Sequence, residues 1–262
     1  MPRPGKRPEG HAPPAVFVHG YSCSSSHWLQ AEERLGDRCE VWRLSLPGHD
    51  DVPAPEGRVL DIAACADYVA ERVQETGRAG ARLIGHSLGG MVGMQCVAEH
   101  PDLFGGLVLV DSFPRLGAPD PFTRSYWHGT PPHLKGRVVR QMMNNRRRLP
   151  LTLWESVVAF DGAPYLAAMP VPVRGIYGDR GEEDHERLRN LLTGFGLGAV
   201  PDLELHVIRD AGHFVMLERP AAFFRLLGRI LEGLTCMDAS PPCPPLLNGE
   251  GGRGVRQRSL GE

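Results

Sequence analysis

The chain has 262 residues, of which 42% are hydrophobic and 23% charged, and its formal net charge at pH 7 is −2. This length is enough for one α/β domain with a full hydrophobic core. The near-neutral charge excludes a nucleic-acid binder built on a basic surface and an acidic disordered protein, so we expect no nucleic-acid partner.

Both ends of the chain have the composition of disordered tails. Residues 1–14 hold five prolines and two glycines, and residues 237–262 are also rich in proline and glycine. The amino-terminal stretch lacks the apolar segment of a signal peptide, and no apolar run reaches the roughly 18 residues that a membrane span requires. The cysteines include no C-x-x-C pair. We therefore expect a cytoplasmic protein without a membrane partner.

Between the tails, strand-like and helix-like segments alternate. Short apolar runs bounded by glycine and turn residues predict strands. They lie at residues 15–18, 41–44, 81–84, 106–110, 171–177 and 203–208. Apolar residues at i, i+3 and i+4 spacing predict helices over 62–73 and 223–231. This alternation predicts an α/β fold whose mostly parallel central sheet is flanked by helices and whose core comprises residues 15–112 and 170–236.

One stretch interrupts the alternation. Residues 113–169 contain aromatic residues, prolines and methionines but no clear strand, and they are far longer than a connection between two strands needs. We predict an inserted, largely helical cap. Its arginine run, Arg146 to Arg148, fits a solvated helix face better than a site for an anionic substrate.

The pentapeptide Gly85-His-Ser-Leu-Gly89 is the most informative motif of the chain. It follows the predicted strand at 81–84 and precedes a helical stretch, which is the strand–turn–helix context of a G-x-S-x-G nucleophile elbow. The small residues on either side of Ser87 allow the tight turn, and the serine stands at the amino end of a helix that favours negative charge. We predict that Ser87 is a nucleophile.

A serine nucleophile needs a base and donors for the oxyanion. A general base raises the reactivity of the weakly nucleophilic hydroxyl, and His213 follows the last predicted strand on a glycine-containing loop. Backbone amides fixed at the right distance stabilise the tetrahedral oxyanion. We predict that His213 is the base, and that the amides of Leu88 and Tyr21 form the oxyanion hole.

These motifs together resemble the α/β-hydrolase superfamily, and most closely its serine esterase and acyl-hydrolase branch. The resemblance spans about residues 15 to 234. It rests on His19-Gly20, Pro47-Gly48-His49, Gly85-His-Ser-Leu-Gly-Gly90, Leu107-Val-Leu-Val-Asp111, Gly212-His-Phe214 and Glu218-Arg-Pro220. It implies an eight-stranded sheet, a cap after the sixth strand, and no metal or organic cofactor. Since the first recognisable strand lies close to the chain's start, we expect the leading antiparallel strands to be reduced or missing.

The acid of the catalytic triad is where the sequence departs from the pattern. Many relatives read Gly-x-x-Asp after the penultimate strand, whereas this chain has Gly178-Asp-Arg-Gly181. Asp179 comes two positions too early, and Asp184 comes late. Some relatives instead carry the acid after the strand that follows the nucleophile helix, where this chain has Asp111. We predict Asp111 as the acid, with Asp179 second and Asp184 third.

The sequence therefore predicts a serine hydrolase that cleaves a carboxylic ester, lactone or thioester through an acyl-enzyme on Ser87. Trp127, Met142 and Trp154 of the cap are predicted to line the pocket, which suggests a small-molecule substrate with an apolar group. The same residues also suit amide or peptide cleavage, C–C bond hydrolysis or another specialised biosynthetic step. An alternative of a different class is a non-catalytic small-molecule receptor on the same fold.

Overall fold

A computed structural model of the protein describes residues 12–77, 79–116, 125–199 and 203–236. The predicted tail at 237–262 lies outside these residues, as do residues 117–124 of the predicted cap. Most of the predicted amino-terminal tail is outside them too, but its residues 12–14 belong to the first strand, so the tail prediction is wrong there. None of the described helices combines the length and apolar character that a membrane span requires.

Six parallel strands form one sheet in the order β2-β1-β3-β4-β5-β6. They are β1 (Ala12–Val18), β2 (Cys39–Leu44), β3 (Ala81–His86), β4 (Phe104–Val110), β5 (Val173–Gly178) and β6 (Glu204–Ile208). All six predicted strands are confirmed. The described residues contain no antiparallel leading strand, so the sheet has six strands where the resemblance implied eight.

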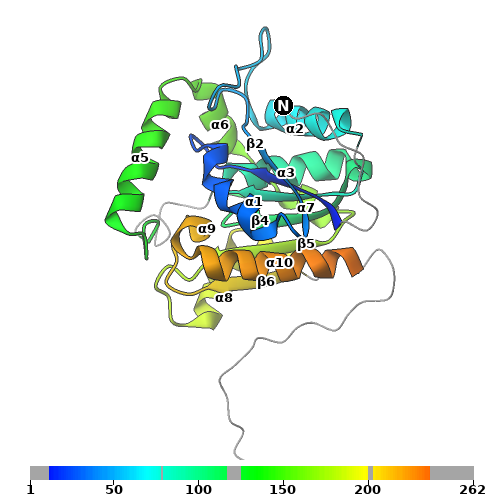
Figure 1. The fold of residues 1–262 in the computed structure, drawn as a ribbon. Coiled ribbons are helices and arrows are strands. Elements are labelled where there is room, and N and C mark those ends of the chain that lie inside the picture. Colours follow the sequence, from blue (N-terminus) through cyan, green and yellow to red (C-terminus); the bar gives the residue numbers. More distant parts are fainter. Residues whose placement is uncertain (1–11, 78, 117–124, 200–202, 237–262) are drawn as a thin grey trace, which may run out of the picture.

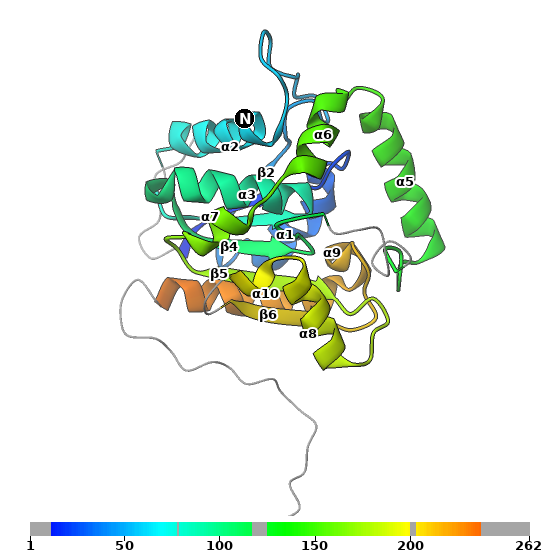
Figure 2. The ribbon, with the colours of Figure 1, turned by 180° about the vertical axis from the view of Figure 1, so that it is seen from behind.

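Helices cover both faces of the sheet (Figures 1 and 2). One face is covered by α1 (Leu29–Leu35), α9 (Val215–Glu218) and α10 (Pro220–Cys236). The other is covered by α2 (Ile62–Glu75), α3 (Leu88–Glu99) and α8 (His185–Gly194). Short 3₁₀ segments lie at Ser25–Trp28, Pro101–Leu103 and Leu197–Ala199. The predicted helices at 62–73 and 223–231 are therefore present.

Successive side chains of a strand point to opposite faces, which gives the molecule two apolar cores. In β1, Val16 and Val18 face the α2–α3 side, while Ala15 and Phe17 face α1 and α10. All four are fully buried. Burial on both faces explains why the strands read as continuous apolar runs in the sequence.

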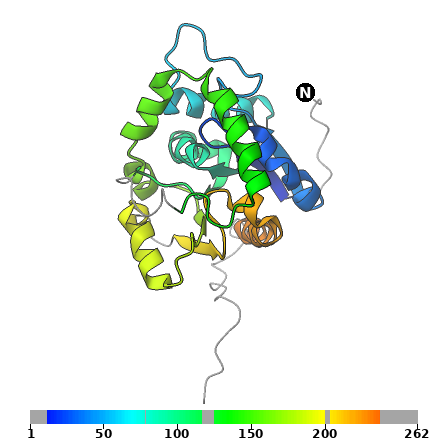
Figure 3. The same ribbon diagram turned by 90° about the vertical axis from the view of Figure 1, so that its left-hand side faces the viewer.

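Among the described residues between β4 and β5, three further helices lie within the predicted cap. They are α5 (Pro132–Arg146), α6 (Leu151–Ala159) and α7 (Ala163–Ala167). Figure 3 shows α5 crossing in front of the sheet, apart from the helices that cover its faces. Leu134 and Val138 of α5 are buried against the α1–α10 side, whereas Leu153 and Val157 of α6 join the core on the other side.

Candidate active site

The carboxyl ends of the parallel strands bring the predicted site residues to one edge of the sheet. Gly20 follows β1, Ser87 follows β3, Asp111 follows β4, Arg180 follows β5 and His213 follows β6. Because parallel strands all end at the same edge, residues that are far apart in the sequence meet there. The structure thus brings Ser87, Asp111 and His213 to the same cavity.

Ser87 occupies a strained turn between β3 and α3. Its backbone dihedral angles are φ 52° and ψ −118°, a conformation that L-residues rarely adopt. A Cβ atom on Gly85 would overlap the backbone oxygen of Gly89, and one on Gly89 would overlap the backbone oxygen of Val18. The two glycines are therefore required for the turn, which has the predicted strand–turn–helix geometry.

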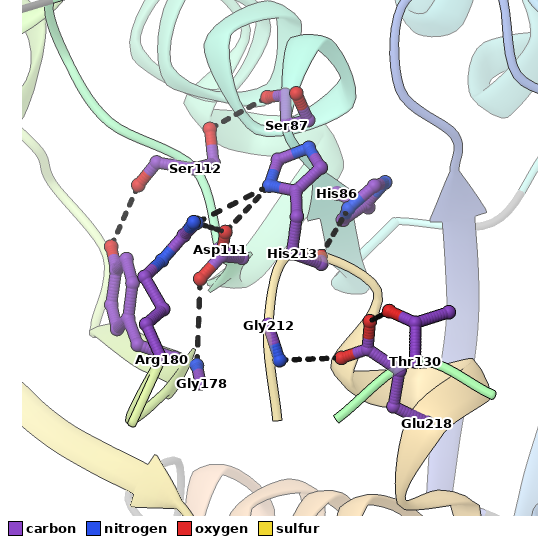
Figure 4. Close-up of polar contacts among 11 residues, drawn as sticks. His86, Ser87, Asp111, Ser112, Thr130, Gly178, Arg180, Gly212, His213 and Glu218 are labelled. Atoms are coloured by element: carbon purple, nitrogen blue, oxygen red, sulfur yellow. Dashed lines mark hydrogen bonds and ion pairs between the residues drawn. The ribbon is translucent and has the colours of Figure 1, made fainter. Parts of the chain in front are cut away.

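The imidazole of His213 is hydrogen-bonded to Asp111. Nδ1 of His213 donates to Oδ2 of Asp111 over 2.6 Å, and Oδ1 of Asp111 accepts from the amide of Gly178 at 3.4 Å. Asp111 is fully buried. Figure 4 shows the imidazole lying between Ser87 and Asp111. The arrangement leaves Nε2 of His213 on the side of the ring that faces Ser87.

The two alternative acids hold other groups. The carboxylate of Asp179 accepts hydrogen bonds from the amides of Gly181, Asp210 and Ala211 at 3.2, 3.0 and 3.3 Å. Asp184 caps the amino end of α8 by accepting from the backbone of the first turn. Asp179 thus fixes the loop that carries His213, but neither carboxylate bonds to the imidazole.

Arg180 is a site residue that the sequence did not reveal. Its Nη2 donates to Oδ2 of Asp111, the same oxygen that His213 uses, and lies 3.5 Å from Nδ1 of His213. Burial is the main cause that lowers the pKa of His213; Asp111 raises this pKa and Arg180 lowers it. The only signal in the sequence was the replacement of the expected Gly-x-x-Asp by Gly178-Asp-Arg-Gly181.

A buried carboxylate fixes the loop of His213 from the opposite side. Glu218 accepts from the amide of Gly212 at 2.6 Å and from the hydroxyl of Thr130, which joins the loop to the segment preceding α5 (Figure 4). Burial raises the pKa of Glu218 despite these hydrogen bonds. The loop is therefore attached to both the sheet and the inserted region.

Two rings fix His213 itself. His86, the residue before Ser87, is buried and uses Nε2 to donate to the carbonyl of His213 at 2.9 Å. Burial lowers its pKa well below the usual value, so its ring is neutral. The ring of Tyr126 stacks on that of His213 with 4.3 Å between centroids, and its carbonyl accepts from the amide of His213 at 2.9 Å.

Two further histidines shape the loop after β1. Nε2 of His19 accepts from the amide of Leu46, and Nε2 of His49 accepts from the amide of Ser22, both at 3.1 Å. Burial lowers the pKa of His19 to about 3 and also lowers that of His49. As neutral rings they act as hydrogen-bond acceptors that hold this loop in place.

The predicted oxyanion donors lie beside Ser87. Tyr21 and Leu88 both line the cavity, and Leu88 is the first residue of α3. Within the described part of the chain, no hydrogen bond occupies the backbone amide of either residue. Amides at a helix's amino end that lack an internal acceptor are available to an anion.

The cavity above Ser87 has a volume of about 350 Å³. Most of its lining is apolar or aromatic. The side chains include Cys23, Met91, Phe113, Leu116, Tyr126, Val157 and Phe195. Met142 and Trp154 line it as predicted, but Trp127 is not among the described lining residues. Trp127 instead stacks on the buried Phe214, with ring centroids 5.2 Å apart, so the prediction for this residue is corrected.

The described residues include one cluster with the composition of a metal site, Asp67, Glu99 and His100. It lies on α2 and at the end of α3, and none of its members lines the cavity. Asp67 is already paired with Arg58. We therefore assign no metal to this cluster.

The buried neutral histidines predict how stability depends on pH. Burial lowers the pKa of His19 to about 3 and that of His27 to about 4, whereas an unfolded histidine titrates near 6.5. The unfolded chain therefore binds more protons below pH 6.5, so stability is full above that pH and falls as the pH drops toward 4. We expect the unfolding temperature, measured by calorimetry between pH 7 and 4.5, to fall steadily.

The variant His27→Gln should reduce this dependence, because it removes one group that must be protonated on unfolding. His133→Gln, at an exposed position on α5, is the matched control and should leave the slope unchanged. Equal slopes for the wild type and His27→Gln would contradict the prediction.

Several known proteins are similar to this chain. A dihydrolipoyllysine-residue acetyltransferase component of an acetoin cleaving system from Cupriavidus necator is 27% identical over 87% of the chain and 66% of its own length. A pimeloyl-[acyl-carrier protein] methyl ester esterase from Neisseria meningitidis is 37% identical over 40% of the chain and 39% of its own length. The chain thus spans less than two thirds of either relative.

A solved structure supports the fold. A thermophilic esterase from Thermogutta terrifontis superposes with a TM-score of 0.71 at 19% identity, covering 86% of this chain and 92% of that one. The sequence model of the alpha/beta hydrolase family matches residues 15–226. This range includes all six strands except the first three residues of β1, and it includes all of the site described above. The chain therefore belongs to the alpha/beta hydrolase family.

Proposed function

We propose that the protein is a serine hydrolase that cleaves a carboxylic ester, lactone or thioester, with Ser87, His213 and Asp111 as its catalytic triad. The observation that carries this proposal is the 2.6 Å hydrogen bond from His213 to Asp111, on the edge of the sheet where the elbow holds Ser87. Esterases among the similar proteins support the same reaction class.

In this mechanism the hydroxyl of Ser87 attacks the carbonyl carbon of the substrate. Nε2 of His213 takes the hydroxyl proton as the C–O bond forms, and the carbonyl oxygen becomes an oxyanion. The amides of Leu88 and Tyr21 stabilise it, and the loss of one such donor costs about 3 kcal/mol. The imidazolium then protonates the leaving group, and a water molecule activated by His213 releases the acid from Ser87.

Asp111 sets the tautomer of His213. The hydrogen bond from Nδ1 to the carboxylate keeps the proton on Nδ1, so Nε2 carries the lone pair that accepts the proton of Ser87. The negative charge of Asp111 also stabilises the imidazolium that forms during the reaction. Arg180 opposes this second effect because it brings a positive charge to the same oxygen.

The proposal is tested by covalent labelling with a fluorophosphonate, followed by hydrolysis of p-nitrophenyl esters of graded chain length. We expect the wild type to be labelled and to hydrolyse at least one ester. We expect Ser87→Ala to do neither. Ser112 also lines the cavity, so Ser112→Ala is the matched control and should retain labelling.

Two other outcomes separate the alternatives. A wild-type protein that is neither labelled nor active would overturn the proposal in favour of a non-catalytic receptor. Labelling that is lost in Ser87→Ala, without turnover of any ester, would support the triad but favour an amide or C–C bond substrate.

A further inference from the structure

The cavity wall carries more positive than negative charge. Among the described lining residues, Asp111 is the only carboxylate, while Arg115, Arg146 and Arg180 supply three guanidinium groups. Arg180 is paired with Asp111. Arg115 donates to both carboxylate oxygens of Asp161, at 2.8 and 2.7 Å. Within the described part of the chain, Arg146 has no hydrogen bond or ion pair, so its charge is not compensated there.

Two aromatic rings hold the guanidinium of Arg146. Cζ of Arg146 lies 5.8 Å from the ring centroid of Tyr21 and 5.8 Å from that of Trp154. The centroids of these two rings are 5.2 Å apart. A guanidinium that contacts aromatic rings keeps the N–H donors on its edge available, in a geometry that matches a carboxylate or phosphate. Arg146 is therefore oriented without its donors being used.

Arg146 lines the same cavity as the proposed catalytic residues Ser87 and His213. The ring beneath it belongs to Tyr21, whose amide is one of the two proposed oxyanion donors. The side chain is exposed at the end of α5 and lines the cavity at the same time, which places its charge at the cavity mouth. A substrate whose carbonyl reached the amide of Tyr21 would extend along the apolar wall toward this guanidinium.

We propose that Arg146 binds an anionic group of the substrate, so that the ester cleaved at Ser87 also carries a carboxylate or phosphate beyond an apolar spacer. The apolar lining of the cavity suits the spacer, and the guanidinium suits the charged end. A monoester of an aliphatic dicarboxylic acid is the simplest member of this class. The inference rests on the proposed function for the reaction, but not for anion binding itself.

The other two residues of the arginine run, Arg147 and Arg148, differ from Arg146 in their contacts and position. Arg148 donates to the side-chain oxygen of Asn145 at 2.9 Å, and Arg147 is exposed and lies outside the described cavity lining. Arg147 thus fits the predicted solvated helix face. Arg146 lines the cavity, where an arginine that binds an anionic substrate would have to lie. Arg147 also provides a control with the same charge on the same helix end.

The test compares two esters that differ only in a terminal carboxylate, p-nitrophenyl hexanoate and mono-p-nitrophenyl adipate. We expect Arg146→Gln to lower the ratio of kcat/KM for the adipate ester to that for the hexanoate ester by about three- to fivefold, mainly through KM. Arg147→Gln should change this ratio by less than about twofold. Arg146→Lys should recover part of the loss because it restores the charge without the planar fork.

If Arg146→Gln and Arg147→Gln changed this kcat/KM ratio equally, the proposal would be overturned. Equal changes would indicate a long-range electrostatic effect of positive charge and not binding of the anion by Arg146. A second arm needs no turnover: calorimetric titration of the wild type and both variants with adipate, and separately with hexyl phosphate. Weaker binding in Arg146→Gln alone supports the proposal, and the two ligands distinguish a carboxylate from a phosphate. Unchanged binding of both ligands overturns it, whereas failure of the proposed function appears as missing Ser87-dependent labelling.

Discussion

Replacing Asp111 by asparagine is expected to lower kcat/KM by about 10⁴-fold. The amide group is nearly isosteric with the carboxylate, but its NH₂ group cannot accept a hydrogen bond from Nδ1–H of His213. The imidazole then favours the tautomer with its proton on Nε2, where it cannot accept a proton from Ser87. The imidazolium of the transition state also loses the adjacent negative charge.

The same substitution at the two alternative acids provides the control. Asp184→Asn removes a charge on the loop after β5, and asparagine also caps a helix, so kcat/KM should stay within about threefold. Asp179→Asn weakens hydrogen bonds to the loop that carries His213, so it should lower kcat/KM more than Asp184→Asn does, but far less than Asp111→Asn, because its carboxylate does not bond to the imidazole. The measurement is kcat/KM of each variant with one ester. The unfolding temperature of each variant shows whether it is folded. A large loss in Asp179→Asn with near-normal turnover in Asp111→Asn would exchange their roles.

The strands and the elbow were predictable because local rules and the global fold agree there. Buried parallel strands need apolar residues on both faces, and the turn at Ser87 needs small residues at Gly85 and Gly89. Both requirements leave a direct pattern in the sequence. The position of His213 followed from chain order, since the last strand must end at the edge where Ser87 stands.

The acid remained open in the sequence because two adjacent strands end at the same edge. β4 delivers Asp111 and β5 delivers Asp179, and parallel neighbours place both within reach of the loop that carries His213. Only the side-chain directions distinguish them. Asp111 takes a left-handed φ of 42° that aims its carboxylate at the imidazole, whereas Asp179 bonds to backbone amides of the last loop.

Features of the cap were the least predictable. Composition identified aromatic residues and a run of arginines, but it does not say which face of a helix or loop meets the cavity. Trp127 packs on Phe214, whereas Trp154, predicted on the same grounds, lines the cavity. In the same way the arginine run gives no indication that Arg146 alone lies on the rings of Tyr21 and Trp154.

Replacing Arg180 by methionine is expected to lower the free energy of unfolding by about 3 kcal/mol. The guanidinium and the carboxylate of Asp111 are almost fully excluded from solvent, with side-chain exposures of 6% and 0%. Removing one partner of a buried ion pair leaves the other charge without its compensation. Chemical denaturation of the wild type and Arg180→Met measures the loss.

Arg180→Met should also move the acid limb of the pH–rate profile. The groups that face His213 are Asp111, which raises its pKa, Arg180, which lowers it, and the neutral rings of His86 and Tyr126. Without Arg180 the carboxylate acts alone, so the pKa of His213 rises and a higher pH is needed to keep the base unprotonated. We expect the acid limb of kcat/KM to shift to higher pH.

Arg180→Lys separates this electrostatic effect from a general loss of structure. Lysine keeps a positive charge beside Asp111, so the acid limb should stay near its wild-type position even where the changed geometry lowers stability. A limb that moves equally in the methionine and lysine variants would show that shape and not charge controls the pKa of His213. If the limb is unchanged in Arg180→Met, the basicity of His213 depends on burial and Asp111 alone.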